Sequence, residues 1–247
     1  MNAETLIGVA LIAFLAAVCQ SVTAFGFALV MVPLLTLVWE VKPAVVTSTL
    51  LSTSFMIPLL YEVRARTEPR AITPLLAGSV VGVPVGIVVL SQVDATVLQL
   101  TVAGTVLLAS LTLSWPPRLS AEQPNVMTAF AAGGLSGALR AATSMSGPPV
   151  VLYALSRFGD DVDRFRANVL GVLLPGSLVT IAGVALAGLI DGEILLACLA
   201  AAPTMIAGTV IGSRLRSRFQ PKVFRRVVLS VLVGATAVIV VSTLTKS

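Results

Sequence analysis

The sequence predicts an all-α integral membrane protein made of two halves of opposite orientation. Three observations point to this fold class. Of the 247 residues, 57% are hydrophobic and 11% are charged, with a mean hydropathy of +1.01, whereas an ordinary soluble domain carries about 25% charged residues. The apolar residues are grouped in long stretches, and two stretches are interrupted at corresponding places. Such a surface suits lipid, because a soluble protein must present a polar layer to water.

Six stretches are long and apolar enough to cross a bilayer as single helices of ~20 residues. They are residues 43–61, 71–91, 95–113, 167–188, 193–212 and 224–244. Four of them contain a proline: Pro58, Pro84, Pro175 and Pro203. A proline kinks a membrane helix without ending it, because neighbouring groups satisfy the freed carbonyl.

Two further apolar regions, residues 5–39 and 125–156, each contain a polar break. As one helix, the first region would be ~52 Å long, too long for a ~30 Å hydrocarbon core. It is expected to form two pieces of ~16 and ~13 residues by the same length rule. In the second region, Pro148-Pro149 cannot continue a helix from upstream. Both regions are therefore expected to be broken helices or helical hairpins that return to the side they entered.

The two halves share one plan, a broken element followed by three spans. Phe25-Gly26 in the first break corresponds to Ser146-Gly147 in the second. We expect residues 1–115 and 116–247 to be two repeats of one integral membrane domain. A broken element that returns to its own side leaves three crossings per half, so the second repeat must be inverted.

Two Gly-x-x-x-Gly pairs also correspond between the halves. They are Gly82/Gly86 and Gly208/Gly212. This motif lets two membrane helices approach closely. We expect these glycines to hold the halves together and not to contact a ligand.

The basic residues predict the orientation. Of the 16 Lys and Arg residues, all but Lys42, Arg140 and Lys246 fall in loops on one predicted side. The positive-inside rule makes that side cytoplasmic and places both termini in the periplasm. The net charge of +5 and the pI near 9.9 therefore do not indicate a nucleic-acid partner, and no basic-aromatic stripe is present.

The two breaks are the expected binding site. A half-helix that starts inside the membrane presents free N–H groups and the positive end of its dipole, which suits an anion, and paired broken helices mark midplane sites in secondary transporters. The alternative is that the small polar residues only pack helices. The candidates are Gln20, Ser21, Thr23, Phe25 and Gly26 in the first break and Thr143, Ser144, Ser146 and Gly147 in the second.

Two further candidates lie near the second break. Arg140 falls inside an apolar segment, where a charge is costly and indicates function. It either supplies a fixed positive charge to an anion or extends to the cytoplasmic interface, as long basic side chains do. Asn168, two residues after Arg166, is a candidate for lining the pathway.

Several classes of function are excluded by what the chain lacks. It contains no histidine, so neither a Ser-His-Asp triad nor a His-ligated metal site can form. Its 11 acidic residues fall in predicted loops or at span ends, which leaves no buried carboxylate relay for protons. Phosphate-loop and dinucleotide motifs are absent. We therefore expect no enzyme activity, cofactor or metal.

The residues at the breaks resemble the TauE/SafE family of sulfite exporters. The similarity lies in Ser21-Val-Thr-Ala-Phe-Gly-Phe27 with Val32-Pro33-Leu34-Leu35, in Ser146-Gly-Pro-Pro-Val-Val-Leu-Tyr153, and in the repeat plan over essentially the whole chain. The resemblance implies transport of small anions such as sulfite, sulfonates or carboxylates across the bacterial inner membrane. The partners it implies are a small anion and the lipid bilayer, and a homo-oligomer is compatible with it.

The chain also departs from the common pattern of that family. Only Gly26 remains of a run of glycines at the first break, and Arg140 precedes the second. These changes favour an organic sulfonate such as sulfoacetate over bare sulfite. The sequence thus predicts an anion exporter that works by alternating access. A channel-like anion pathway and a non-transporting scaffold subunit remain the alternatives.

Overall fold

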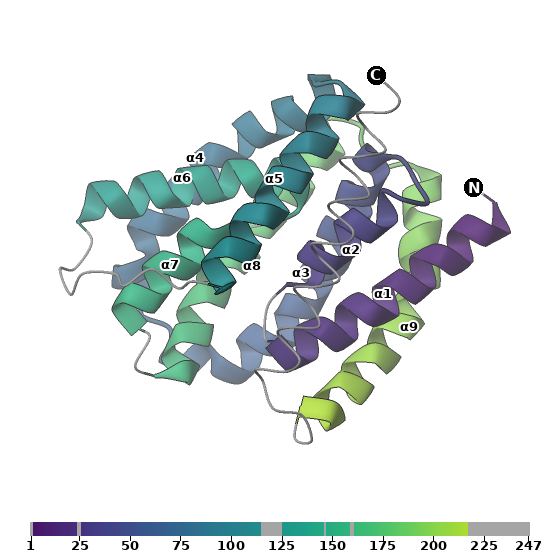
Figure 1. Cartoon of the computed structure of the whole chain (residues 1–247). Coiled ribbons are helices and arrows are strands. Elements are labelled where there is room, and N and C mark those ends of the chain that lie inside the picture. Colours follow the sequence, from purple (N-terminus) through teal and green to yellow (C-terminus); the bar gives the residue numbers. More distant parts are fainter. Residues whose placement is uncertain (1, 24–25, 115–124, 146, 159–160, 217–247) are drawn as a thin grey trace.

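The computed structural model describes residues 2–23, 26–114, 125–145, 147–158 and 161–216, and these form nine α-helices and one 3-10 turn (Figure 1). The helices are α1 (Ala3–Thr23), α2 (Phe27–Leu35), α3 (Val41–Val63), α4 (Pro69–Gln92), α5 (Ala95–Ser114), α6 (Val126–Thr143), α7 (Gly147–Phe158), α8 (Val162–Leu186) and α9 (Gly192–Arg216), with the turn η1 (Arg64–Arg66) after α3. The predicted all-helical class is confirmed for these residues. The expected span 224–244 lies outside them.

Both apolar regions are broken where the sequence predicts. Gly26 has a left-handed backbone (φ 108°) at the start of α2, and Ser144 is left-handed (φ 63°) at the end of α6. Gly147 and the two prolines after it form the first turn of α7, where a missing N–H breaks no helical hydrogen bond. The expected length of the first piece, ~16 residues, was wrong, because α1 continues through Gln20 and Ser21 to a length of 21 residues.

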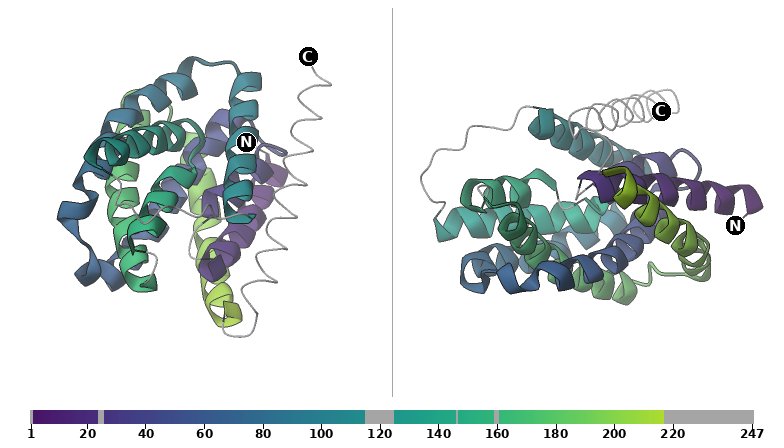
Figure 2. Two further views of the ribbon diagram at one scale, coloured as in Figure 1. Left: turned by 60° about the vertical axis from the view of Figure 1, so that its left-hand side comes forward. Right: turned by 90° about the horizontal axis from the view of Figure 1, so that it is seen from below.

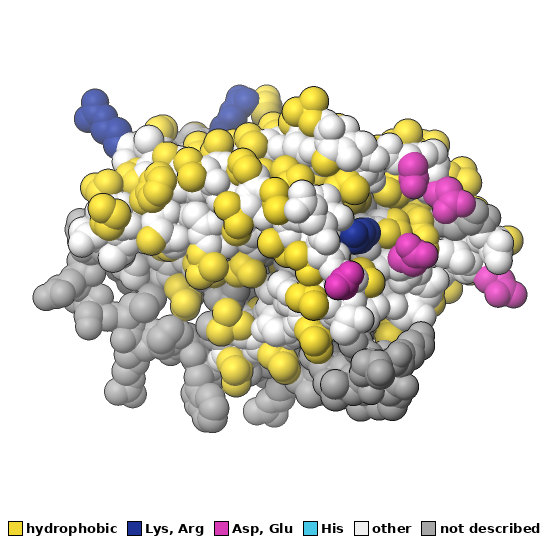
Figure 3. Space-filling model, turned by 90° about the horizontal axis from the view of Figure 1, so that it is seen from above, with side chains coloured by type: hydrophobic (Ala, Val, Ile, Leu, Met, Phe, Trp, Pro, Cys, Tyr) yellow, Lys and Arg dark blue, Asp and Glu magenta, His cyan; other side chains and the backbone are white. Residues whose placement is uncertain are grey.

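Five helices in the described part of the chain are long and apolar enough to cross a membrane. They are α1, α3 with η1, α4, α8 and α9. Many of their large apolar side chains point outward, such as Leu11 (59% exposed) and Leu199 (72%). Figure 3 shows hydrophobic side chains spread over the described part of one face, with a small number of charged groups among them. Such a surface requires lipid around it.

The buried residues form two main cores, and each combines helices from both halves of the sequence. The first core draws mainly on α1, α2, α3 and α5, together with α9 from the second half. The second core draws on α6, α7 and α8, together with α4 from the first half. Cys19 and Cys198 are half-buried and pack against the first core. The fourth helix of each half is therefore packed into the other half.

Glycines make these exchanged contacts close. A Cβ at Gly78, Gly82 or Gly86 of α4 would collide with the backbone carbonyl of Phe130, Gly134 or Ala138 of α6, respectively. Likewise, a Cβ at Gly208 of α9 would meet the carbonyl oxygen of Phe14 in α1 at 2.5 Å. Figure 2 shows α1 and α9 side by side, as are α4 and α6. The expectation that these glycines join the halves is confirmed.

Candidate functional site

The polar groups of the first break are largely bonded to its own backbone. Gln20 is buried, and its Oε1 accepts a hydrogen bond from the Phe27 N–H at 2.9 Å, so the side chain bridges the end of α1 and the start of α2. The Ser21 hydroxyl donates to the Ala17 carbonyl at 2.8 Å. Thr23 is the last residue of α1, but its side chain and Phe25 lie outside the described residues. Gln20 therefore occupies one of the α2 N–H groups that were expected to face an anion.

The second break is tied to a helix of the first half. The Ser144 N–H donates to the Arg140 carbonyl at 2.7 Å and closes α6, while its hydroxyl donates to the Ser48 hydroxyl of α3 at 3.1 Å. The Thr143 hydroxyl donates to the Leu139 carbonyl at 2.7 Å and accepts from the Met145 N–H at 3.3 Å. Ser146 lies outside the described residues, and Gly147 begins α7. Neighbouring Met145 packs in the first core, so this break borders helices from both halves.

Arg140 is the charged residue at the centre of the helix bundle. Its side chain is 1% exposed, and Nη1 donates to the Leu173 carbonyl of α8 at 3.2 Å. A Cβ at Gly176, also on α8, would collide with the same Nη1. The guanidinium thus lies against the middle of α8, in a space that exists because residue 176 has no side chain. Of the two expectations for Arg140, the geometry favours a buried charge over an interfacial one.

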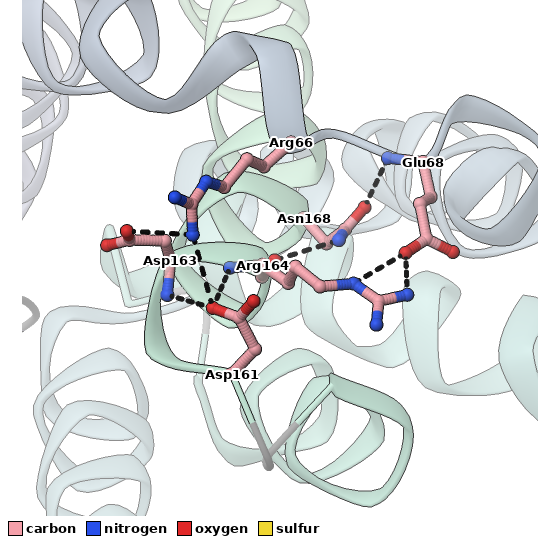
Figure 4. A network of polar contacts seen from close by, with 6 residues as sticks. All are labelled: Arg66, Glu68, Asp161, Asp163, Arg164 and Asn168. Carbon is pink, nitrogen blue, oxygen red and sulfur yellow. Dashed lines mark hydrogen bonds and ion pairs between the residues drawn. The ribbon is translucent and has the colours of Figure 1, made fainter.

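Asn168 lies in a polar network where the start of α4 meets α8 (Figure 4). Its Oδ1 accepts from the Glu68 N–H at 2.8 Å, and its Nδ2 donates to the Arg164 carbonyl at 2.8 Å. Its amide is therefore engaged in joining the two halves, and lining a pathway remains a prediction.

Ion pairs surround this amide. Arg164 Nε donates to Glu68 Oε1 at 2.9 Å, and Arg66 pairs with Asp163 at 3.0 Å and with Asp161 at 3.6 Å. Asp161 also caps α8, because its Oδ1 accepts from the N–H groups of Asp163 and Arg164. The hydrogen bond from the Arg164 N–H is the main reason why the pKa of Asp161 is lowered from its usual 3.8. The carboxylate therefore keeps its negative charge, and with it the cap and the ion pairs to Arg66, to a lower pH than a free aspartate would.

The sequence analysis missed a group of buried hydroxyls. Five lie on α3, beside the second break: Thr47, Ser48, Thr49, Ser52 and Thr53. The run of small hydroxyl residues inside an apolar span was the available signal. Ser79 on α4 is also fully buried. The hydroxyls of Thr47 and Ser79 have no hydrogen-bond partner within the described ranges, which is uncommon for buried polar groups.

An open depression of about 590 Å³ lies at the start of α4, close to the network of Figure 4. Thr67, Glu68, Pro69, Arg70, Ala71 and Arg157 line it. No group of His, Cys, Asp and Glu side chains in the described segments is arranged to hold a metal ion. The polar groups of this bundle thus include a buried guanidinium, buried hydroxyls and the arginines that line the depression, all of which suit an anion.

Comparisons with known proteins agree with this chemistry. Residues 9–239 match the family model described as "Sulfite exporter TauE/SafE". A curated protein of Cupriavidus necator, "Probable sulfite/organosulfonate exporter TauE", is 28% identical over 224 residues, which cover 88% of this chain and 87% of that protein. No solved structure matches the chain significantly.

Proposed function

Because the chain belongs to the TauE/SafE sulfite exporter family, a family of membrane transporters and not of enzymes, we propose that it exports sulfite or an organosulfonate such as sulfoacetate by alternating access. It is a multi-pass protein of the bacterial inner membrane. The observation that carries the proposal is Arg140, a buried charge held between α6 and α8. Intramembrane charges are costly and mark substrate pathways.

A guanidinium is suited to sulfite and sulfonates. These anions present several oxygens around one sulfur, and the planar fork of Arg offers five N–H donors to such groups. Around it we assign the residues of the two breaks to the binding region: Gln20, Ser21, Thr23, Phe25 and Gly26, with Thr143, Ser144, Ser146 and Gly147, and Asn168 at its cytoplasmic end. The absence of intramembrane carboxylates in the sequence favours an anion over a cation.

The transport cycle rests on two inverted repeats, residues 1–115 and 116–247. The exchanged packing supports them, because α4 lies on α6 in the same way as α9 lies on α1. In each pair the helices run parallel, and a glycine meets a backbone carbonyl once per turn. Rocking of one core against the other would expose a central site to each side in turn.

The orientation gives the direction of transport. The basic side, with the network of Figure 4 and the depression near Arg70, faces the cytoplasm, and both termini face the periplasm. An anion that leaves an inside-negative cell gains roughly 2.3 kcal/mol per charge for every 100 mV. Export can therefore proceed without a coupling ion.

The test is anion efflux from proteoliposomes loaded with sulfite, sulfoacetate or a simple carboxylate. We expect saturable efflux of the sulfur anions. Arg140→Ala should lower it at least about 30-fold, because the anion would then enter the bundle without a compensating charge. Arg140→Lys should retain part of the flux, since it keeps the charge but loses the fork.

Arg64→Ala is the matched control, because it removes an exposed arginine from the basic side that does not line the depression. It should transport like the wild type. Flux that rises linearly with the gradient would instead assign the chain to a channel-like pathway. Absence of flux for every anion would contradict the proposal and favour a scaffold subunit.

A further inference from the structure

Ser79 is, with Thr47 and Ser110, one of three buried hydroxyl residues that have no hydrogen-bond partner among the described residues. Most of the other buried hydroxyls donate to a carbonyl of their own helix, as Thr143 does to Leu139, Thr49 to Val45 and Thr180 to Gly176. Ser79 is 0% exposed, and its Oγ has no hydrogen-bond partner among the described residues. A buried hydroxyl left in this way is unfavourable, so it requires an explanation.

The surroundings of Ser79 show where its hydroxyl points. Its backbone lies at the crossing of α4 and α6, where a Cβ at Gly137 would collide with the Ser79 carbonyl. On the other side, a Cβ at Gly176 of α8 would lie 2.9 Å from Ser79 Oγ and would collide with Arg140 Nη1. The hydroxyl and the guanidinium therefore border the same small space, which the missing side chain of Gly176 leaves between α4, α6 and α8.

Glycine in the middle of a helix is unfavourable compared with alanine. Gly176 lies in the middle of α8, directly after Pro175. Its retention there is explained by this contact, because any side chain would displace the guanidinium. Three residues on three helices thus bring a charged N–H donor and a hydroxyl donor close together where α8 carries no side chain.

We propose that Ser79 is a ligand of the transported anion: its O–H binds an oxygen of the sulfite or sulfonate group while Arg140, whose guanidinium is accommodated beside Gly176, binds the others. This assignment rests on the proposed function. Ser79 belongs to the first half of the chain, whereas Arg140 and Gly176 belong to the second, so the oxyanion is held by both. When the anion binds, it takes the place of the Leu173 carbonyl as acceptor for Arg140 and gives the Ser79 hydroxyl an acceptor.

The experiment compares Ser79→Ala with Thr180→Val in proteoliposomes. Ser79→Ala deletes the hydroxyl and keeps the packing of α4 on α6. It should raise the KM for sulfite and for sulfoacetate equally, by about tenfold, with little change in maximal flux. Thr180→Val removes a buried hydroxyl of α8 that already has an acceptor, and its KM should match the wild type. The melting temperature of each purified variant, with and without sulfite, provides a second readout; sulfite should raise it less for Ser79→Ala.

Two results would overturn the assignment. A KM for Ser79→Ala equal to that of the wild type or Thr180→Val would leave the hydroxyl without a role in binding. A rise confined to sulfoacetate would place it against the organic portion and not against the oxyanion. Failure of the proposed function itself is distinct, because the wild type would then transport neither anion.

Discussion

Asn168 and the charged groups around it differ in how firmly each one joins α4 to α8. The amide is 1% exposed and makes two hydrogen bonds at 2.8 Å. The side chains of Arg66 and Arg164 are 54% and 49% exposed, so water and salt weaken their ion pairs. At this junction the neutral buried residue should therefore contribute more stability than the charged ones.

We expect Asn168→Ala to lower the free energy of unfolding by about 1–3 kcal/mol, because it leaves the Glu68 N–H without its acceptor. Arg164→Ala should lower it by less than about 1 kcal/mol. Thermal melting of the detergent-purified variants measures both. Equal losses would contradict the larger contribution that we assign to the amide.

The candidate site could be predicted in part at this scale. Arg140 was identifiable because a charge in an apolar stretch is conspicuous in any sequence. The bond from the Glu68 N–H to Asn168 could not be foreseen, since it joins residues 100 positions apart and depends on the fold. Ser79 gave no signal either, because its missing partner is a property of the helices that face it.

At the scale of single elements, the backbone preferences of glycine and proline set the positions where the helices break. The positions of polar residues alone did not. Gly26 and the two prolines of α7 marked both interruptions, as backbone rules require. Polarity was a poorer guide, because α1 continues past Gln20 and Ser21. The hydroxyl of Ser21 bonds back to Ala17, and so a polar residue can remain within an apolar helix.

The close contacts between helices lead to a prediction about glycine. Gly82→Ala and Gly208→Ala should each lower stability by about 1–3 kcal/mol, because the new methyl group meets a backbone carbonyl that cannot move aside. Gly104→Ala on α5 is the matched control, since it is exposed and nothing lies within 4 Å of its Cβ position. It should be neutral or slightly stabilising. Melting temperatures and the monodisperse fraction after purification report the outcome; equal effects at all three positions would contradict it.

At the scale of the whole molecule, the sequence predicted the helices but not their partners. A Gly-x-x-x-Gly pair indicates that a helix packs closely and does not say against which neighbour. The exchange of α4 and α9 between the two cores therefore could not be predicted from the sequence. It is also the strongest support for the proposed repeats, because each exchange mirrors the other.

Inversion of the repeats predicts that equivalent loops face opposite sides. Ala65 lies between α3 and α4, and Gly192 lies at the corresponding link between α8 and α9; both are exposed. After Cys19 and Cys198 are replaced by alanine, a cysteine at 192 should react with a membrane-impermeant thiol reagent in intact cells. A cysteine at 65 should react only in inside-out vesicles. Labelling of both from the same side would refute the inverted arrangement.

The exchanged helices also affect how the protein is made. A chain grows from its N-terminus, so α4 is synthesised before α6, the helix against which its glycines pack. The interval is longer for α1, which is synthesised first and packs against α9. Until then, the glycine-lined faces must rest against lipid or against the insertion machinery. The second core has all its helices once α8 has been synthesised, whereas the first core is completed only when α9 has been synthesised.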